Sequence, residues 1–166
     1  MGVKAVKLKF SNKPKEFWSN IKKIDLEGTE EDAEELLGDV EPQYMELDGV
    51  ISKENGTVVI ILDESYLIGA RDSKIVFSFN ESQPNSVMMV KTAIGNGAYV
   101  FDEKNRRQIC SCTVGLFPFE FTVCTEDILN TVTYEKGGTL TVDYTVEING
   151  IPADGSKMVL KVEPVR

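Results

Sequence analysis

The feature that most limits the fold is an alternation of apolar and polar residues with a period of two, which runs from residue 43 almost to the end. Such alternation is typical of β-strands that bury one face. Short turn sequences, such as Glu54-Asn55-Gly56 and Asn149-Gly150, separate successive segments and favour hairpins. We therefore expect about ten strands, spaced at steps of roughly 10 to 15 residues.

A long run of antiparallel strands leaves two unpaired edges, and exposed edges promote aggregation, so the sheet is expected to close or to form a sandwich. One apolar and one polar face in each strand favours an antiparallel barrel with a filled or ligand-holding interior. Composition agrees, because Val, Ile and Thr supply 41 residues and Ala only 6. The positions that we predict to face inward are Ile75, Phe77, Phe79, Phe117, Phe119, Phe121, Val123, Leu140, Val142, Tyr144, Val146 and Ile148.

Residues 12–40 interrupt this pattern. Phe17, Ile21 and Ile24 recur at the spacing of one helix face. A second short helix is predicted over 29–37, where a Thr can cap the N-terminus and a Gly can end the last turn. We interpret 12–40 as an acidic, helical insertion near the N-terminus of a single domain that spans residues 1–166.

The segment Val58–Leu62 is apolar on both faces, so its outer face is expected to be covered. The insertion is the candidate cover, and we predict that residues 15–37 are helical and pack against this strand.

Charge is distributed unevenly around a net value of −9. Residues 1–23 contain seven lysines and one Glu, whereas residues 24–48 contain eleven acidic residues and no Lys or Arg. These segments are interpreted mainly as solvated faces, with docking of a basic partner as the alternative. Nucleic-acid binding is not expected for so acidic a chain. No apolar run approaches the roughly 18 residues of a membrane span, so no membrane association is expected either.

The absence of histidine excludes Ser-His-Asp triads, Cys-His dyads and histidine metal sites. Cys110 and Cys112 lie two apart on one predicted strand, where they share a face and cannot pair comfortably. We expect free thiols in a reducing cytoplasm, with a pairing that involves Cys124 and a metal site as less favoured alternatives. No catalytic residue, metal or cofactor is assigned.

Candidate ligand-binding residues are those able to line the mouth of a barrel. Arg71 and Arg106 could hold an anion, although both positions are also ordinary for surface residues. Tyr99 and Tyr144 could present hydroxyl groups to the interior, or could be core aromatics. Phe119 and Phe121 complete this set as apolar lining.

The run Gly137-Gly138-Thr139-Leu140-Thr141-Val142-Asp143-Tyr144-Thr145-Val146-Glu147-Ile148-Asn149-Gly150, preceded by Tyr99-Val100-Phe101-Asp102-Glu103, resembles the C-terminal part of the YwiB-like bacterial proteins. That family of unknown function has a calycin-like, or lipocalin-like, β-barrel. The resemblance covers roughly residues 40–163. It implies a lipocalin-like (calycin) barrel of eight to ten strands and a bacterial, intracellular setting, and it implies no substrate. The sequence departs from the family pattern at Thr113–Phe117 and in the length of its insertion.

Three functions are compatible with these features. The favoured one is a non-catalytic module that binds a small apolar or amphipathic ligand at the barrel mouth. The second is a protein-interaction module that uses the acidic insertion or an exposed strand edge, including self-association as a homodimer. The third is an enzyme with a carboxylate or Tyr acid-base pair.

Many large side chains are predicted to face the interior, so we expect any pocket to be small, lined by aromatics and near the mouth. We also expect Phe119→Ala to lower the free energy of unfolding by roughly 3–5 kcal/mol, as a substitution at a packed core position does.

Overall fold

The computed structural model describes residues 2–15, 43–63, 74–91, 97–114 and 117–165. These residues form one ten-stranded antiparallel sheet with the order β6-β5-β4-β3-β2-β1-β10-β9-β8-β7. The strands are β1 Gly2–Pro14, β2 Gln43–Glu54, β3 Thr57–Asp63, β4 Lys74–Asn80, β5 Gln83–Lys91, β6 Gly97–Asp102, β7 Arg107–Val114, β8 Phe117–Asn130, β9 Gly138–Ile148 and β10 Ile151–Pro164. The prediction of an all-β antiparallel barrel is confirmed, and its strand count is at the upper end of the expected range.

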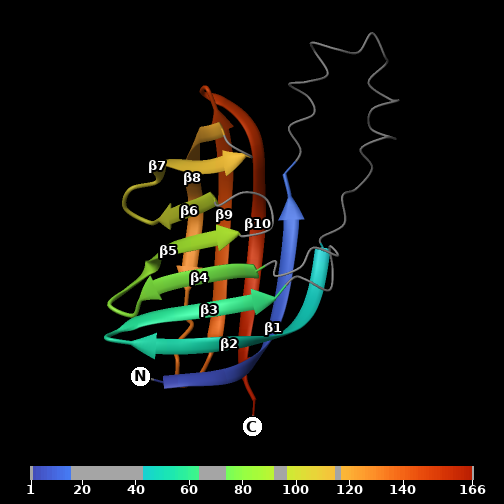
Figure 1. The fold of residues 1–166 in the computed structure, drawn as a ribbon, viewed down its shortest axis with the longest axis vertical. Coiled ribbons are helices and arrows are strands. Elements are labelled where there is room, and N and C mark those ends of the chain that lie inside the picture. The colour runs from blue at the N-terminus through green and yellow to red at the C-terminus, as the bar shows by residue number, and fades with distance from the viewer. Residues whose placement is uncertain (1, 16–42, 64–73, 92–96, 115–116, 166) are drawn as a thin grey trace.

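The sheet folds over on itself, so that the layer formed by β2 to β6 lies in front of the layer formed by β10, β9 and β8 (Figure 1). Its two edge strands, β6 and β7, then lie side by side. The amide of Asp102 donates a hydrogen bond to Thr125 Oγ1 at 3.2 Å. Gly97 lies so close to β7 that an added Cβ would be 3.0 Å from Cys112 Cβ. The barrel is therefore nearly closed, although no backbone ladder joins β6 to β7 within the described residues.

One end of the barrel is closed by the connection between β8 and β9. Asn130 is buried there, and its side-chain amide donates to the carbonyl of Pro84 at 2.9 Å. The Asn55-Gly56 hairpin turn also lies at this end, with φ values of 52° and 82°. Positive φ at both central residues is the requirement of the tight turns that suit the strand twist. At the opposite end, which we call the mouth, lie the strand ends Pro14, Asp63, Lys91, Val114 and Ile148.

The core consists of the inward positions of the alternating strands, as predicted. Ile75, Phe77, Phe79, Phe121, Val123, Leu140, Val142, Tyr144 and Val146 are buried, and Ile148 is half-buried against them. The prediction is wrong for Phe117 and Phe119, which are 77% and 39% exposed. The first residue of β8 that pairs with β9 is Thr122, so the start of β8 pairs only with β7 and extends beyond the packed interior. Phe119 is thus a rim residue rather than a core residue.

Two local features of the strands, the turn between β4 and β5 and a bulge in β8, are not evident from the alternation of side chains. The turn between β4 and β5 lies at Glu81–Ser82, because β5 begins at Gln83. Strand β8 continues to Asn130, with a β-bulge between Thr125 and Asp127. This bulge shifts the inward positions from odd to even numbers, so that Ile128 is buried.

The predicted helical insertion over 12–40 begins too early, because β1 continues to Pro14 and Asn12 pairs with both β10 and β2. The rest of the insertion, from residue 16 onward, lies outside the described residues. In β3, Val58, Ile60 and Leu62 are buried on the inner face, whereas Val59 and Ile61 are half-buried on the outer face. The cover proposed for Val59 and Ile61 stays a prediction. The described parts of the chain contain no helix with the length and apolar character needed to cross a membrane.

Candidate functional site

Four aromatic side chains meet just inside the mouth, and we call them the mouth cluster: Tyr99, Phe101, Phe121 and Tyr144. The ring centroids of Tyr99 and Phe121 are 5.0 Å apart with the rings nearly perpendicular, and those of Phe101 and Tyr144 are 4.8 Å apart. Tyr99 also contacts Tyr144, at 6.1 Å between centroids. The residues come from β6, β8 and β9, whose inward positions the barrel closure brings together. Such edge and tilted contacts are favourable for aromatic rings.

Neither of the two tyrosine hydroxyl groups in this cluster makes a hydrogen bond to another described residue. Tyr144 is only 4% exposed and Tyr99 is half-buried, but neither hydroxyl is among the fully buried side-chain atoms without a partner. Burial raises the pKa of Tyr144, and the neighbouring Tyr99 and Asp154 add to this effect. Burial also raises the pKa of Tyr99, with Asp154 as the next cause. Both groups therefore stay protonated and can donate a hydrogen bond.

Asp154 reaches the mouth through a β-bulge in β10. Pro152 pairs with Glu147 and Asp154 pairs with Val146, so Ala153 is the extra residue. Since Val146 faces inward, the bulge puts Asp154 on the inward register, two positions before Ser156, the partner of Tyr144. Asp154 Oδ1 accepts a hydrogen bond from the amide of Gly155 at 2.8 Å, and the residue is exposed. The mouth thus carries a carboxylate next to two tyrosines.

Lys91 is the positive group nearest to the mouth cluster. It follows the buried Val87 and Met89 at alternate positions of β5, so it lies on the inward register at the end of the strand. Its Nζ lies 5.8 Å from the centroid of the Tyr99 ring. That separation is within the range of a cation–π interaction.

The three thiols are free and give no nucleophile. Cys110 is buried on the inner face, and burial raises its pKa. Cys124 lies on the outer face of β8, where its Sγ contacts Glu147 Oε2 at 3.1 Å and Arg107 Nη1 at 3.3 Å. Burial and the hydrogen bond to Glu147 raise the pKa of Cys124 more than Arg107 lowers it. A reactive thiol requires the opposite shift.

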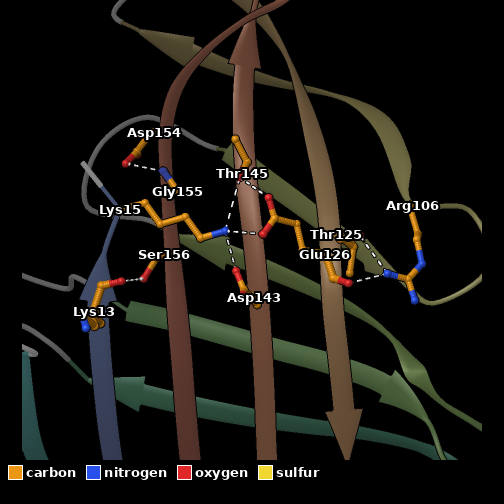
Figure 2. Close-up of polar contacts among 10 residues, drawn as sticks. All are labelled: Lys13, Lys15, Arg106, Thr125, Glu126, Asp143, Thr145, Asp154, Gly155 and Ser156. Carbon is orange, nitrogen blue, oxygen red and sulfur yellow. Dashed lines mark hydrogen bonds and ion pairs between the residues drawn. The ribbon is translucent and has the colours of Figure 1, made fainter. Parts of the chain in front are cut away.

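A second polar group, the ion cluster, lies on the outer face and consists of Lys15, Glu126, Asp143 and Thr145 (Figure 2). Lys15 Nζ pairs with Asp143 Oδ1, with Glu126 Oε2 at 2.9 Å and with Thr145 Oγ1 at 3.3 Å. To reach them its side chain crosses β10 over Gly155, where an added Cβ would lie 3.1 Å from Lys15 Cδ. The Lys15 contact lowers the pKa of Glu126. Every charged group of this cluster has a partner, so we assign it to stability.

The structure brings together Tyr99, Phe121 and Tyr144 of the predicted ligand-binding residues, with Phe119 on the rim. Arg106 lies in the turn after β6, where its Nε donates to the carbonyl of Glu103 at 3.2 Å. Its Nη1 donates to the carbonyls of Thr125 and Glu126 (Figure 2). None of these contacts joins its guanidinium to the mouth cluster, and its role in holding a ligand stays a prediction. Arg71 lies outside the described residues.

Sequence reasoning missed Lys91 and Asp154. The inward register of Lys91, two residues after Met89, could have identified it. Asp154 could not be found in this way, because the bulge that positions it has no reliable sequence signal.

Two further features were considered as sites. A shallow hollow lies on the outer face of the first three strands and is lined by Val3, Ser52, Glu54, Asn55, Thr57 and Val59. It has no aromatic lining and no convergent charges, so the expectation of a small aromatic pocket at the mouth stays a prediction. Among the residues described, no three acidic or cysteine side chains converge to hold a metal ion.

Comparison with known proteins agrees with this architecture. The family described as "Domain of unknown function (DUF1934)" matches residues 24–160. The crystal structure of the YwiB protein from Bacillus subtilis is similar to this chain with a TM-score of 0.67 at 12% sequence identity, over 99% of this chain and 94% of that chain. The resemblance to YwiB-like proteins is thus confirmed for the fold. No sequence among the curated proteins matches.

Proposed function

Because the chain belongs to the DUF1934 family, whose function is unknown, we propose a function from the geometry of the barrel: it is a non-catalytic module that binds a small apolar or amphipathic ligand at the mouth. The observation that carries the proposal is the pair of tyrosine hydroxyls in the mouth cluster, which lack a hydrogen-bond partner among the described residues. A bound ligand with a polar end would supply that partner, and the aromatic rings would contact its apolar part.

The packing of the interior supports a small ligand. Phe101 and Tyr144 are buried and in contact with each other, so the barrel is filled below Tyr99. A ligand at the mouth can contact the half-buried Tyr99 and the rim residue Phe119, next to the ring of Tyr144. A long lipid chain would have to displace the core.

The direction of the pKa shifts of the described carboxyl groups supports a non-catalytic role rather than that of an acid-base enzyme. The carboxyl groups whose pKa departs from the ordinary value are Asp102, Glu126, Glu135 and Glu147, and in each the pKa is lowered by hydrogen bonds. A carboxyl that acts as a general acid near neutral pH needs a raised pKa. We also propose a bacterial cytoplasmic location, which the three free thiols support.

The test is native mass spectrometry of the freshly purified full chain, together with titration of N-phenyl-1-naphthylamine, a neutral amphipathic fluorophore. We expect a small-molecule adduct or saturable uptake of the fluorophore. Phe119→Ser should reduce it, whereas Ile109→Ser should not, because Ile109 lies on the same hairpin but faces outward, with 78% of its side chain exposed. If the wild type shows neither an adduct nor saturable uptake, the proposal is wrong.

Self-association is the second candidate, and the exposed tip of the β7–β8 hairpin favours it. Phe117 is a large apolar side chain in contact with solvent there. Light scattering during size-exclusion chromatography should then show a dimer that Phe117→Ser converts to a monomer. Leu129→Ser is the control, because Leu129 is exposed at the other end of β8. A wild type that stays monomeric at every concentration rules this candidate out.

A further inference from the structure

Asp154 and Lys91 are two charged groups at the mouth that differ in what they act on. Asp154 lies on the inward register opposite Val146, and its charge adds to the effect of burial in raising the pKa of Tyr99 and Tyr144. Lys91 instead lies over the ring of Tyr99, with Nζ 5.8 Å from the centroid. The two tyrosines therefore have a carboxylate in their surroundings, and the ring of Tyr99 already holds a cation.

The aromatic surface of the mouth also favours positive charge. The face of an aromatic ring carries negative electrostatic potential, which attracts ammonium groups and is the basis of aromatic cages. Solvent can reach the half-buried ring of Tyr99 and the ring of Phe119, which is 39% exposed. A ring with a carboxylate nearby is a suitable site for a ligand that combines an ammonium group with a small apolar body.

We propose that the mouth binds the ammonium group of a small amphipathic amine, over the ring of Tyr99 and beside the carboxylate of Asp154. The ligand would take the position that Lys91 Nζ now occupies over the ring, so that Lys91 competes with it. This inference rests on the proposed ligand-binding function and adds the charge of the ligand to it.

The test uses three probes with the same branched head and different charge: choline, the neutral 3,3-dimethyl-1-butanol and the anionic 3,3-dimethylbutyrate. Each is titrated into the isotope-labelled full chain while the NMR signals of the Tyr99 ring are followed. We expect choline to bind about tenfold more tightly than the alcohol, as a partly desolvated cation–π contact and a nearby carboxylate imply. The carboxylate probe should bind most weakly.

Charge-matched variants identify the groups responsible. Asp154→Asn, whose amide oxygen can still accept the Gly155 hydrogen bond, should remove most of the preference for choline and leave the alcohol unaffected. Asp48→Asn makes the same change in charge at an exposed position of β2 and should change nothing. Lys91→Gln should strengthen choline binding severalfold, and Lys161→Gln, at an exposed position of β10, should not. Unchanged backbone amide spectra establish that the variants are folded.

The outcomes separate the two proposals. If the alcohol binds at Tyr99 as tightly as choline, or the carboxylate binds more tightly, the ammonium inference is overturned while the ligand site stands. If Lys91→Gln weakens choline binding, the competition with Lys91 is overturned. If no probe moves the Tyr99 signals, the ammonium inference fails, and the adduct and fluorophore measurements decide separately whether the mouth binds ligands at all.

Discussion

The mouth cluster and the ion cluster lie on opposite faces of the same strand, β9, and they differ in how their polar groups are satisfied. Thr145 faces outward, and its Oγ1 donates to Glu126 Oε1 at 2.9 Å and accepts from Lys15 Nζ. Tyr144, the preceding residue, faces inward, and its hydroxyl has no hydrogen-bond partner among the described residues. Both residues are buried. The Thr145 hydroxyl is already engaged by two neighbours, so we assign its cluster to stability, whereas the Tyr144 hydroxyl stays available to a ligand.

The largest effect on stability is expected for a substitution where the mouth cluster joins the core. Phe101→Ala should lower the free energy of unfolding by about 3–5 kcal/mol, because a fully buried ring is removed. Phe119→Ala should cost about 1 kcal/mol or less, because its ring is partly exposed on the rim. Urea unfolding followed by circular dichroism measures both. Equal costs would show that the rim is packed like the core, and would remove the basis for a site at the mouth.

The second-largest effect on stability is expected when Lys15 of the ion cluster is replaced. Lys15→Met should lower the free energy of unfolding by about 1 kcal/mol at pH 7, since two carboxylates lose their partner. The Lys15 contact lowers the pKa of Glu126, so this stabilisation is present above the ordinary pKa of Glu and is lost as the pH falls through the lowered value. The difference between variant and wild type should therefore shrink by roughly pH 3.

Lys157→Met is the control for Lys15→Met, because Lys157 is an exposed lysine on β10. It should leave stability unchanged at both pH values. A Lys15→Met difference that persists in acid would mean that the lysine stabilises the protein by packing over Gly155 rather than by its charge.

The comparison between the two faces of β9 can be tested directly with Thr145→Val. This change removes a hydroxyl with two partners while nearly preserving the shape, so we expect a cost of about 1 kcal/mol, measured by thermal unfolding. Combining it with Lys15→Met should give less than the sum of the single effects, because both act on one network. Full additivity would contradict the assignment of these residues to a single cluster.

The smallest effect at neutral pH is expected for Tyr144→Phe. The hydroxyl has no described partner, so its removal should change stability by less than about 0.5 kcal/mol at pH 7. In alkali the result should differ. The pKa of Tyr144 is raised on folding, so the unfolded chain loses its proton first and the folded state is destabilised as the pH rises above 10, the ordinary Tyr pKa.

At roughly pH 11 the Phe variant should consequently be about 1 kcal/mol more stable than the wild type. Chemical denaturation at pH 7 and pH 11 measures this. A large loss of stability at pH 7 would show that the Tyr144 hydroxyl already has a partner, and would contradict the comparison between the two clusters.

Much of the fold could be predicted from the alternation of side chains. The pattern identifies the strands, the inward face of β4 and β9 and the tight turn at Asn55-Gly56, because period-two burial and positive φ leave local signals. The contacts of the candidate site could be predicted only in part. Tyr99, Phe121 and Tyr144 were identified as lining residues, but their meeting depends on β6, β8 and β9 being brought together by closure of the barrel.

An antiparallel all-β fold with an apolar interior follows from local sequence, because the side-chain period is a property of each strand alone. The end of that interior depends on how the strands pair in three dimensions. The extension of β8 beyond β9 moved Phe119 to the rim, and the bulges at Glu126 and Ala153 directed Glu126 toward Lys15 and put Asp154 on the inward register beside Tyr144. Register and bulges are set by pairing between strands distant along the chain, and local sequence does not encode them.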